Sequence, residues 1–295
     1  MTISIYCLGV KAFVALEKID RLFHANIESI IIGRDYHIAN DYSEEIKTFA
    51  LKNGINFVFR NNEATENLTA THHIAIGWKW LIKLQDWQKL YVIHDSLLPK
   101  YRGFNPLVTA LINGDREIGA TSFFAVNNYS NDYDTGLIIQ QKSFIVNYPC
   151  KIAEAINKTA DLYADLLLNL VSLIANNQEM PGVLQNEAEA TYSLWRDKKD
   201  YFINWNQSAD QIKKLVDAVG HPYDGACFYY NDKIIRVAEV NVIDDVQIIN
   251  RGTGKFFKRI NNNPVIVCGK GLLELVQMFD EDKKEFKFEQ FRIRL

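Results

Sequence analysis

The chain has 295 residues, 48% of them hydrophobic, which is enough for one large domain, or a large and a small one, with a substantial core. Its 33 basic residues are outnumbered by 36 acidic ones, and the pI is about 6.1. This balance argues against a nucleic-acid-binding surface spread over the molecule, although it leaves room for a local basic patch. No apolar stretch approaches the roughly 20 residues that cross a bilayer, and the N-terminus lacks the basic region of a signal peptide. We therefore expect a cytoplasmic protein with no membrane partner.

Short apolar stretches alternate with helical periodicity in the first third of the chain. We expect strands at 3–8, 27–32, 55–59, 74–76 and 91–93, and helices at 12–23 and 43–53. This alternation predicts a Rossmann-like α/β domain, in which ligands lie outside the carboxyl ends of the strands. The domain continues with a helix at 106–112, strands at 119–126 and 137–146, a helix at 151–175 and a polar connection at 176–191.

Composition changes near residue 205, after which turns separate short strands. We expect a helix at 209–219 and strands at 226–230, 234–242, 246–249, 264–268 and 272–278. The pattern predicts a catalytic domain over 1–200 and a small β-rich, barrel-like C-terminal domain over 201–295. The four cysteines are far apart and form no C-x-x-C pair, so we expect buried free thiols and no metal site.

Two motifs lie at the ends of predicted strands. His94 comes directly after the strand at 91–93 and opens the segment H-D-S-L-L-P-K-Y-R-G. A single histidine is usually structural, but glycine, polar and basic residues gathered at a strand end are typical of a binding loop. Further along, G-A-T opens the strand at 119–126, and Asp134-Thr135-Gly136 precedes the next one. Taken alone, Asp134 is a turn aspartate.

Together these segments resemble the folate-dependent formyltransferases. The first is similar to their H-x-S-L-L-P-x-x-x-G signature and the second to their G-x-T … D-x-G-x-I segment, in the same order. The family includes glycinamide ribonucleotide transformylase, methionyl-tRNA formyltransferase and the nucleotide-sugar N-formyltransferases. The resemblance extends over nearly the whole chain, and it implies 10-formyltetrahydrofolate as cosubstrate, with no metal.

Formyl transfer to an amine fits these residues. The neutral amine attacks the formyl carbon and gives a tetrahedral intermediate, so a proton must leave the amine nitrogen and another must reach the departing folate nitrogen. Imidazole, whose ordinary pKa lies near neutrality, can do both, and a carboxylate can orient it and stabilise its cation. The resemblance gives these two roles to His94 and Asp134.

The resemblance also suggests binding residues. For the folate it implies Ser96, Leu97, Leu98 and Asp134, and we add the loop Gly77, Trp78 and Lys79 because it follows a predicted strand. For the acceptor it implies Tyr101, Arg102, Gly103, Arg196 and Tyr223, and Lys11, just after the first strand, could add a second positive charge. Arg196 suits a diphosphate, because its planar guanidinium meets phosphate oxygens with two donors. The alternatives are that Arg196 is a surface arginine of the linker and that the tryptophans at 78 and 80 are ordinary core residues.

One position departs from the family pattern. The family usually has Asn two residues before the histidine, where it holds the oxyanion, and this chain has Val92. Loss of such a donor typically costs about two to three orders of magnitude in rate. Another donor could replace it, His94 could act without it, or the protein could be a weak or inactive member. We favour replacement or tolerance, because Tyr101, Arg102 and Asp134 are retained.

The linker points to the acceptor. The segments Y-S-L-W-R-D at 192–197, Y-F-I-N-W at 201–205 and A-V-G-H-P-Y-D-G-A at 218–226 resemble those of sugar N-formyltransferases. The resemblance implies a nucleotide-linked amino-dideoxy sugar, such as a dTDP-4-amino-4,6-dideoxyhexose or a 3-amino-3,6-dideoxyhexose, a role in lipopolysaccharide O-antigen synthesis, and a homodimer.

Two alternatives remain open at this point. Methionyl-tRNA formyltransferase shares His94 and Asp134, but a tRNA substrate calls for an excess of basic residues that the chain lacks. A non-catalytic protein that binds folate or a nucleotide sugar is the other alternative, and only Val92 favours it.

Overall fold

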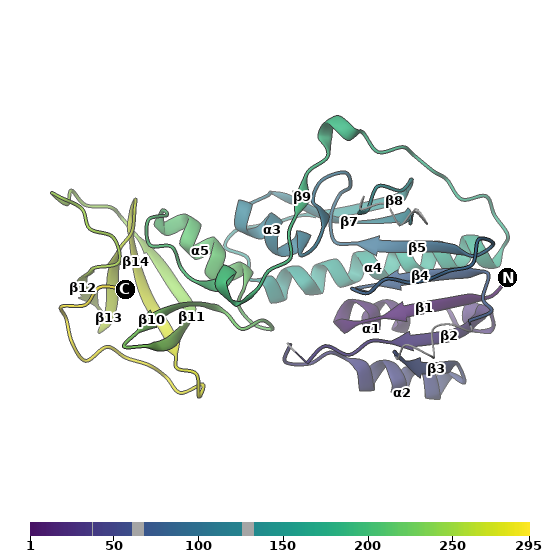
Figure 1. The fold of residues 1–295 in the computed structure, drawn as a ribbon, viewed down its shortest axis with the longest axis horizontal. Helices are drawn as coiled ribbons and strands as arrows, with labels where there is room; N and C mark the ends of the chain where they lie inside the picture. The colour runs from purple at the N-terminus through teal and green to yellow at the C-terminus, as the bar shows by residue number, and fades with distance from the viewer. Residues whose placement is uncertain (37, 61–67, 126–132) are drawn as a thin grey trace. The chain divides into compact units, whose positions relative to one another are not determined.

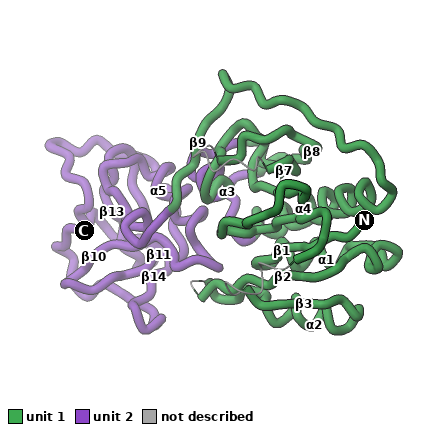
Figure 2. Tube along the Cα trace, turned by 45° about the vertical axis from the view of Figure 1, so that its right-hand side comes forward, with its two compact units in different colours: residues 1–107, 116–146, 154–195 green, residues 108–115, 147–153, 196–295 purple. Residues whose placement is uncertain are grey.

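The structure, a computed structural model, describes residues 1–36, 38–60, 68–125 and 133–295. The chain divides into two compact units, drawn in different colours in Figure 2. Unit 1 comprises residues 1–107, 116–146 and 154–195, and unit 2 comprises residues 108–115, 147–153 and 196–295. Each unit is built around its own β-sheet (Figure 1).

Unit 1 contains a seven-stranded sheet in the order β3-β2-β1-β4-β5-β7-β8. The first five strands in this order run parallel, and β7 and β8 join antiparallel at one edge. The strands are β1 (Ile3–Cys7), β2 (Ile27–Ile32), β3 (Asn56–Phe59), β4 (His72–Ile76), β5 (Lys89–His94), β7 (Glu117–Phe124) and β8 (Ile138–Ile145). The central strands are buried on both faces, which explains their continuous apolar sequences. The predicted Rossmann-like fold is confirmed.

Two hydrophobic clusters cover the two faces of this sheet. Helices α1 (Gly9–Glu17), α2 (Ser43–Asn53) and α4 (Ile152–Ala175) pack with one face in the larger cluster (Figure 1). On the other face, Tyr6, Ile31 and Ala75 form a smaller cluster with Trp78 and Val92, among others. Because side chains alternate along a strand, His94 belongs to the same face as Val92.

The first helix ends earlier than its sequence predicts. The apolar periodicity extends to Phe23, but α1 ends at Glu17 and a 3₁₀ helix follows at Arg21–Asn26. The side chain of Asp20 accepts a hydrogen bond from the backbone N–H of Leu22, at 3.0 Å, and so starts a new helix. A local cap therefore overrides the periodicity here.

Unit 2 contains a five-stranded antiparallel sheet in the order β10-β11-β14-β13-β12. The strands are β10 (Ala226–Tyr230), β11 (Lys233–Ile243), β12 (Phe256–Ile260), β13 (Asn263–Val267) and β14 (Leu272–Phe279). Helix α5 (Ala209–Ala218) begins with a capping box formed by Ser208 and Gln211, and it packs against β11. The predicted β-rich C-terminal part is confirmed, and in the described sheet β10 and β12 are the edge strands.

The sequence predicted one strand of unit 2 wrongly and missed another. Residues 246–249 were expected to form a strand, but Val246 and Ile249 are exposed and belong to an irregular segment held by Arg251. Strand β12 was missed, because Lys258 and Arg259 interrupt its apolar alternation, as is common at a sheet edge.

Several smaller elements complete the described chain. They are β6 (Arg102–Gly103), β9 (Tyr192–Ser193), α3 (Pro106–Asn113) and two short 3₁₀ helices, Glu187–Glu189 and Lys198–Tyr201. All four cysteines are buried and free, as expected. In the described ranges, no helix is both long and apolar enough to cross a membrane.

Candidate active site

Strand β5 delivers His94 at its carboxyl end, on the face that carries the smaller apolar cluster. The imidazole is buried, and its Nε2 lies 2.9 Å from the backbone oxygen of Tyr101. A carbonyl can only accept a hydrogen bond, so Nε2 carries the proton in neutral His94 and Nδ1 is left as the basic nitrogen. Nδ1 lies 3.6 Å from Oδ2 of Asp134. The site therefore presents a basic nitrogen beside a carboxylate that can stabilise the cation formed on protonation.

The backbone holds Asp134 in place. Its Oδ2 accepts a hydrogen bond of 2.7 Å from the backbone N–H of Gly103, and its own backbone is left-handed, with φ of 57°. Two residues on, a Cβ at Gly136 would lie 1.5 Å from the backbone oxygen of Phe124, so only glycine fits there. The D-x-G motif thus has a steric reason, and the paired motifs meet at the contact between Asp134 and Gly103.

The loop after His94 is fixed by hydrogen bonds. Thr121, the last residue of the G-A-T motif, donates to the oxygen of Ser96 at 2.6 Å and accepts from the N–H of Leu98 at 3.1 Å. Gln141 on β8 donates to the oxygen of Leu98 at 2.8 Å. Ser96 donates through its own hydroxyl to the oxygen of Lys100. These residues shape the loop, and sequence reasoning had not identified the contribution of Gln141.

Three further motif residues pack inside unit 1. A Cβ at Gly103 would lie 2.7 Å from the oxygen of Ser193, so a glycine lets β6 and β9 approach closely. Leu97 contacts Gly119, where a Cβ would lie 2.5 Å from the leucine side chain. Tyr101, with a left-handed φ of 56°, turns its carbonyl toward His94. The roles of Leu97, Tyr101 and Gly103 in ligand binding remain predictions.

Arg102 was predicted to bind the acceptor, and its side chain is 0% exposed. Its guanidinium donates to both carboxylate oxygens of Glu187, at 2.7 and 2.8 Å, and to the side-chain oxygen of Gln185. The hydrogen bond with the Glu187 carboxylate raises the pKa of Arg102. Within unit 1 the guanidinium thus forms hydrogen bonds with two residues of the segment 176–191.

Lys11, in the first turn of α1, forms an ion pair with Asp95. The two side chains are 17% and 18% exposed. Burial by itself raises the pKa of Asp95, but the Lys11 ammonium, together with Tyr163 and His94, holds the pKa below its usual range. The pair ties the start of α1 to the residue that follows His94.

The loop after β4 lies beside the end of β1. A Cβ at Gly77 would lie 2.5 Å from the oxygen of Leu8, so this turn requires glycine. Trp78 contacts Tyr6 edge to face, with ring centroids 5.1 Å apart, and its buried indole N–H has no partner among the described residues. Lys79 pairs with Asp35 at 2.7 Å. Trp78 and Val92 thus both belong to an apolar face that ends at His94.

Arg196 and Tyr223 belong to unit 2. One terminal nitrogen of Arg196 lies 3.5 Å from the hydroxyl oxygen of Thr109, and its buried Nε has no partner within the described ranges. The backbone N–H of Tyr223 donates to Gly220 in a turn. Binding roles for both residues remain predictions.

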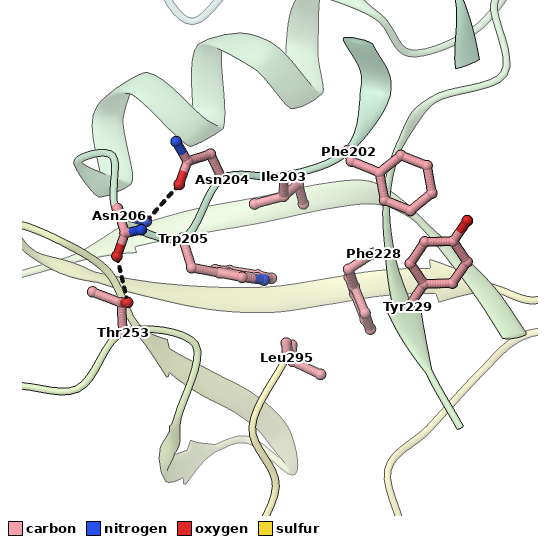
Figure 3. A pocket seen from close by; sticks show the side chains of 9 residues that line it. All are labelled: Phe202, Ile203, Asn204, Trp205, Asn206, Phe228, Tyr229, Thr253 and Leu295. Carbon is pink, nitrogen blue, oxygen red and sulfur yellow. Dashed lines mark hydrogen bonds between the residues drawn. The ribbon is translucent and has the colours of Figure 1, made fainter. Parts of the chain in front are cut away.

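Unit 2 also contains an open cavity of about 350 Å³ (Figure 3). Phe202 and Tyr229 stack at its side, with ring centroids 4.6 Å apart. Asn206 accepts a hydrogen bond of 2.7 Å from Thr253 at another side. Its lining side chains are aromatic, aliphatic, amide or hydroxyl groups, which are suited to contacting a ligand rather than to proton transfer: Phe202, Ile203, Asn204, Trp205, Asn206, Phe228, Tyr229, Thr253 and Leu295.

The described residues include no cluster of three potential metal ligands.

Comparison with known proteins decides the family. Residues 61–171 match the formyl transferase domain, and residues 196–294 match the formyl transferase C-terminal domain. The methionyl-tRNA formyltransferase of Rickettsia bellii is 31% identical over 239 residues, which are 79% of this chain and 74% of that protein. The chain belongs to the formyltransferase family. It spans 62% of the length of another such enzyme, that of Rickettsia massiliae, at 32% identity over 68% of this chain.

Solved formyltransferase structures share the fold. An N-formyltransferase from Helicobacter canadensis, in complex with folinic acid and dTDP-3-aminofucose, has a TM-score of 0.68 at 18% identity and covers 97% of this chain and 100% of that one. WlaRD, a sugar 3N-formyl transferase with dTDP and 5-N-formyl-THF, has a TM-score of 0.67 at 19% identity, over 96% and 99%. A methionyl-tRNA formyltransferase from Clostridium thermocellum has a TM-score of 0.52 at 15% identity, over 72% and 92%.

Proposed function

We propose that the protein transfers a formyl group from 10-formyltetrahydrofolate to the amine of a nucleotide-linked amino-dideoxy sugar, such as a dTDP-4-amino-4,6-dideoxyhexose. The observation that carries the chemistry is the placement of His94. Its Nε2 is engaged by the Tyr101 carbonyl, and its Nδ1 faces Asp134 at 3.6 Å. This arrangement suits a group that accepts a proton from an attacking amine and later returns it.

Each residue has a defined part in the proposed reaction. Nδ1 of His94 accepts the amine proton, and the Asp134 carboxylate stabilises the resulting imidazolium. The same nitrogen then donates a proton to the leaving folate nitrogen. The folate supplies an activated formyl group when bound, and the apolar face formed by Tyr6, Trp78 and Val92 is suited to a planar ring beside the imidazole.

Val92 leaves the oxyanion without a side-chain amide at that position. Val92 packs in the apolar cluster together with Trp78. We propose that the enzyme tolerates the change, because His94, Asp134 and the hydrogen bonds of the loop are all in place. Val92→Asn tests this. A rise in kcat of about 10- to 100-fold would mean that the donor is missing, and an unchanged or lower kcat supports tolerance.

The acceptor is inferred from three observations. The linker segments resemble those of sugar N-formyltransferases, acidic residues outnumber basic ones, and the two sugar N-formyltransferase structures align over 96–97% of the chain, against 72% for the Clostridium thermocellum enzyme. Under this proposal Arg196 and Tyr223 contact the nucleotide sugar, and Gly77 to Lys79 and Ser96 to Leu98 line the folate site. We further propose a cytoplasmic homodimer that serves lipopolysaccharide O-antigen synthesis.

A tRNA acceptor is the second candidate, because the named sequence relatives at 31–32% identity are methionyl-tRNA formyltransferases. A steady-state assay with 10-formyltetrahydrofolate separates the two. The acceptors are dTDP-, UDP- and GDP-linked amino sugars on one side and methionylated initiator tRNA on the other. We expect turnover with at least one amino sugar and none with the tRNA, and His94→Asn should lower kcat by about 10²- to 10⁴-fold. Turnover with the tRNA alone rejects the sugar proposal, and folate binding without any turnover indicates a non-catalytic protein.

A further inference from the structure

The sequence predicts that residues 176–191, between α4 and β9, form a polar connection on the surface. In the structure, however, one side chain of this segment reaches the candidate active site. Gln185 donates through Nε2 to the backbone oxygens of Asp134, at 2.7 Å, and Gly136, at 2.8 Å. Its Oε1 accepts from Nε and Nη2 of Arg102, at 3.0 and 2.8 Å. Both amide hydrogens and the amide oxygen are therefore in use.

These bonds link the turn that carries Asp134 to the loop that follows His94. Asp134 accepts from the N–H of Gly103, which directly follows Arg102 in the chain. Gln185 thus holds the backbone of Asp134 with one end of its amide and the side chain of Arg102 with the other. A single side chain therefore bridges the turn that carries Asp134 and the loop that follows His94, in addition to the hydrogen bond between Gly103 and Asp134.

The turn at Asp134 receives hydrogen bonds from outside itself. Its backbone is left-handed, a conformation that costs most residues other than glycine energy, although aspartate adopts it more readily than most. The carbonyls of Asp134 and Gly136 both receive hydrogen bonds from Gln185. The other contacts of the turn include the Gly103 hydrogen bond and the His94 contact of the Asp134 side chain, the ring contact of Tyr133 with Phe104 and the backbone pairing of Leu137 with Phe124. The two bonds from Gln185 are side-chain hydrogen bonds to the carbonyls of the turn.

The connecting segment, residues 176–191, is itself anchored near Gln185 by backbone and side-chain contacts. Strand β9 pairs in parallel with β6, and the backbone N–H groups of Arg102 and Phe104 donate to the oxygens of Thr191 and Ser193, at 2.8 and 2.9 Å. Glu187, two residues after Gln185, forms the ion pair with buried Arg102. The charge of Arg102 is thereby satisfied within the segment, as burial of a guanidinium requires.

We propose that Gln185 is a positioning residue that holds the Asp134 carboxylate against His94 during formyl transfer. The expected effect on kcat rests on the proposed function, whereas the effect on the position of Asp134 does not. Gln185 does not touch the reacting atoms, and it acts through the Asp134 backbone. The contribution of Glu187, in contrast, is to neutralise Arg102, which supports the fold.

Two substitutions separate these roles. Gln185→Glu keeps an acceptor for Arg102 but cannot donate to the two carbonyls. Glu187→Gln weakens the ion pair but leaves both donors of Gln185 in place. Gln178→Glu, at an exposed position of the same segment, controls for the added charge. If Q185E does not fold at the assay temperature, Gln185→Ser takes its place, because the smaller side chain leaves room for water at the carbonyls.

The kinetic readout is the split between kcat and KM. We expect Q185E to lower kcat by about 10- to 100-fold, with both KM values within about threefold, because small misplacements of catalytic groups cost up to about 10² in rate. E187Q should lower the melting temperature with kcat nearly unchanged, and Q178E should match the wild type. Equal kcat for Q185E and the wild type, or equal kcat losses for Q185E and E187Q, would overturn the proposal.

Hydrogen exchange gives a readout that needs no substrate. The Gly103 amide donates to Asp134 in the wild type, so it should exchange about 10-fold or more faster in Q185E, with the amides of α4 unchanged. A wild-type protein that turns over no acceptor rejects the proposed function, whereas the Gly103 amide still tests the position of Asp134. Unchanged exchange in Q185E rejects the role of Gln185 whatever the acceptor is.

Discussion

Replacing Lys11 by methionine tests whether this lysine stabilises the fold or binds substrate. In the structure its ammonium pairs with Asp95, directly after His94, and both side chains are less than one-fifth exposed. Lys11→Met keeps most of the side-chain volume and removes the charge, so Asp95 becomes a buried carboxylate without its partner.

The cost follows from this burial. Breaking a buried ion pair by removing one partner typically costs about 3–5 kcal/mol, and the residual exposure places this pair at the lower end, at about 3 kcal/mol. In domains of 150–250 residues, 1 kcal/mol lowers the melting temperature by about 2–4 °C, so a decrease of about 6–12 °C is expected for K11M. Lys18→Met is the matched control. Lys18 pairs with Asp161 while both are at least half exposed, and such pairs are worth about 0–1 kcal/mol.

The loss should depend on pH. In the wild type the pKa of Asp95 is lower in the folded state than in the unfolded state, so the pair stabilises the protein above the ordinary aspartate pKa near 4, and this stability is lost as the pH falls through the folded value. In K11M the two lowering effects of Lys11 are lost and burial, the largest single influence, is opposed only by Tyr163 and His94. The folded pKa of Asp95 therefore rises, and protonation at low pH restores part of the lost stability. The difference between the wild type and K11M should therefore be largest at pH 7 and small at pH 3.

Thermal unfolding followed by circular dichroism between pH 3 and 8 measures this difference, and Asp95→Asn in the K11M background should recover part of the loss at pH 7. A loss that is the same at every pH would refute the electrostatic reasoning. An unchanged melting temperature with a raised KM for the nucleotide sugar would instead make Lys11 a substrate ligand, as its position after the first strand suggested.

Three further outcomes are expected. Asp134→Asn keeps an acceptor for Gly103 but removes the negative charge beside the imidazolium, so kcat should fall by about 10²- to 10⁴-fold with KM unchanged; a full-rate D134N would remove the carboxylate from the mechanism. Gly136→Ala would place a Cβ 1.5 Å from the Phe124 oxygen, so we expect thermal melts to show at least about 2 kcal/mol of destabilisation, and a wild-type melt would contradict the geometry. Burial raises the pKa of Asp217 despite Lys213, so ionised Asp217 disfavours folding above its unfolded pKa; Asp217→Asn should raise the melting temperature at pH 7 but not at pH 3, and the reverse order would show the sign to be wrong.

The strands and the reactive residues were accessible from sequence because each is a local pattern. Ile3–Cys7 and Ile27–Ile32 are continuous apolar segments, as strands buried on both faces must be. His94 was identified because its motif follows such a strand. The wrong assignments, at 18–23 and 246–249, are places where one polar contact, from Asp20 or Arg251, overrides the periodicity.

The contacts that make these residues a site depend on the tertiary structure. The pairing of Lys11 with Asp95, the engagement of Arg102 by Gln185 and the approach of Asp134 to Gly103 each join residues at least 31 positions apart in the chain. Hydrophobic periodicity reports only on neighbours within a few turns, so it could not show that Arg102 is fully buried or that Gln185 reaches the turn at Asp134. The sequence by itself determined the fold class and singled out His94 and Asp134 as the proposed acid–base pair. The conformation of the loop after β5 decided which nitrogen of His94 is basic, because the carbonyl of Tyr101 turns back to Nε2. The return of distant segments onto this loop decided what holds Asp134 beside His94.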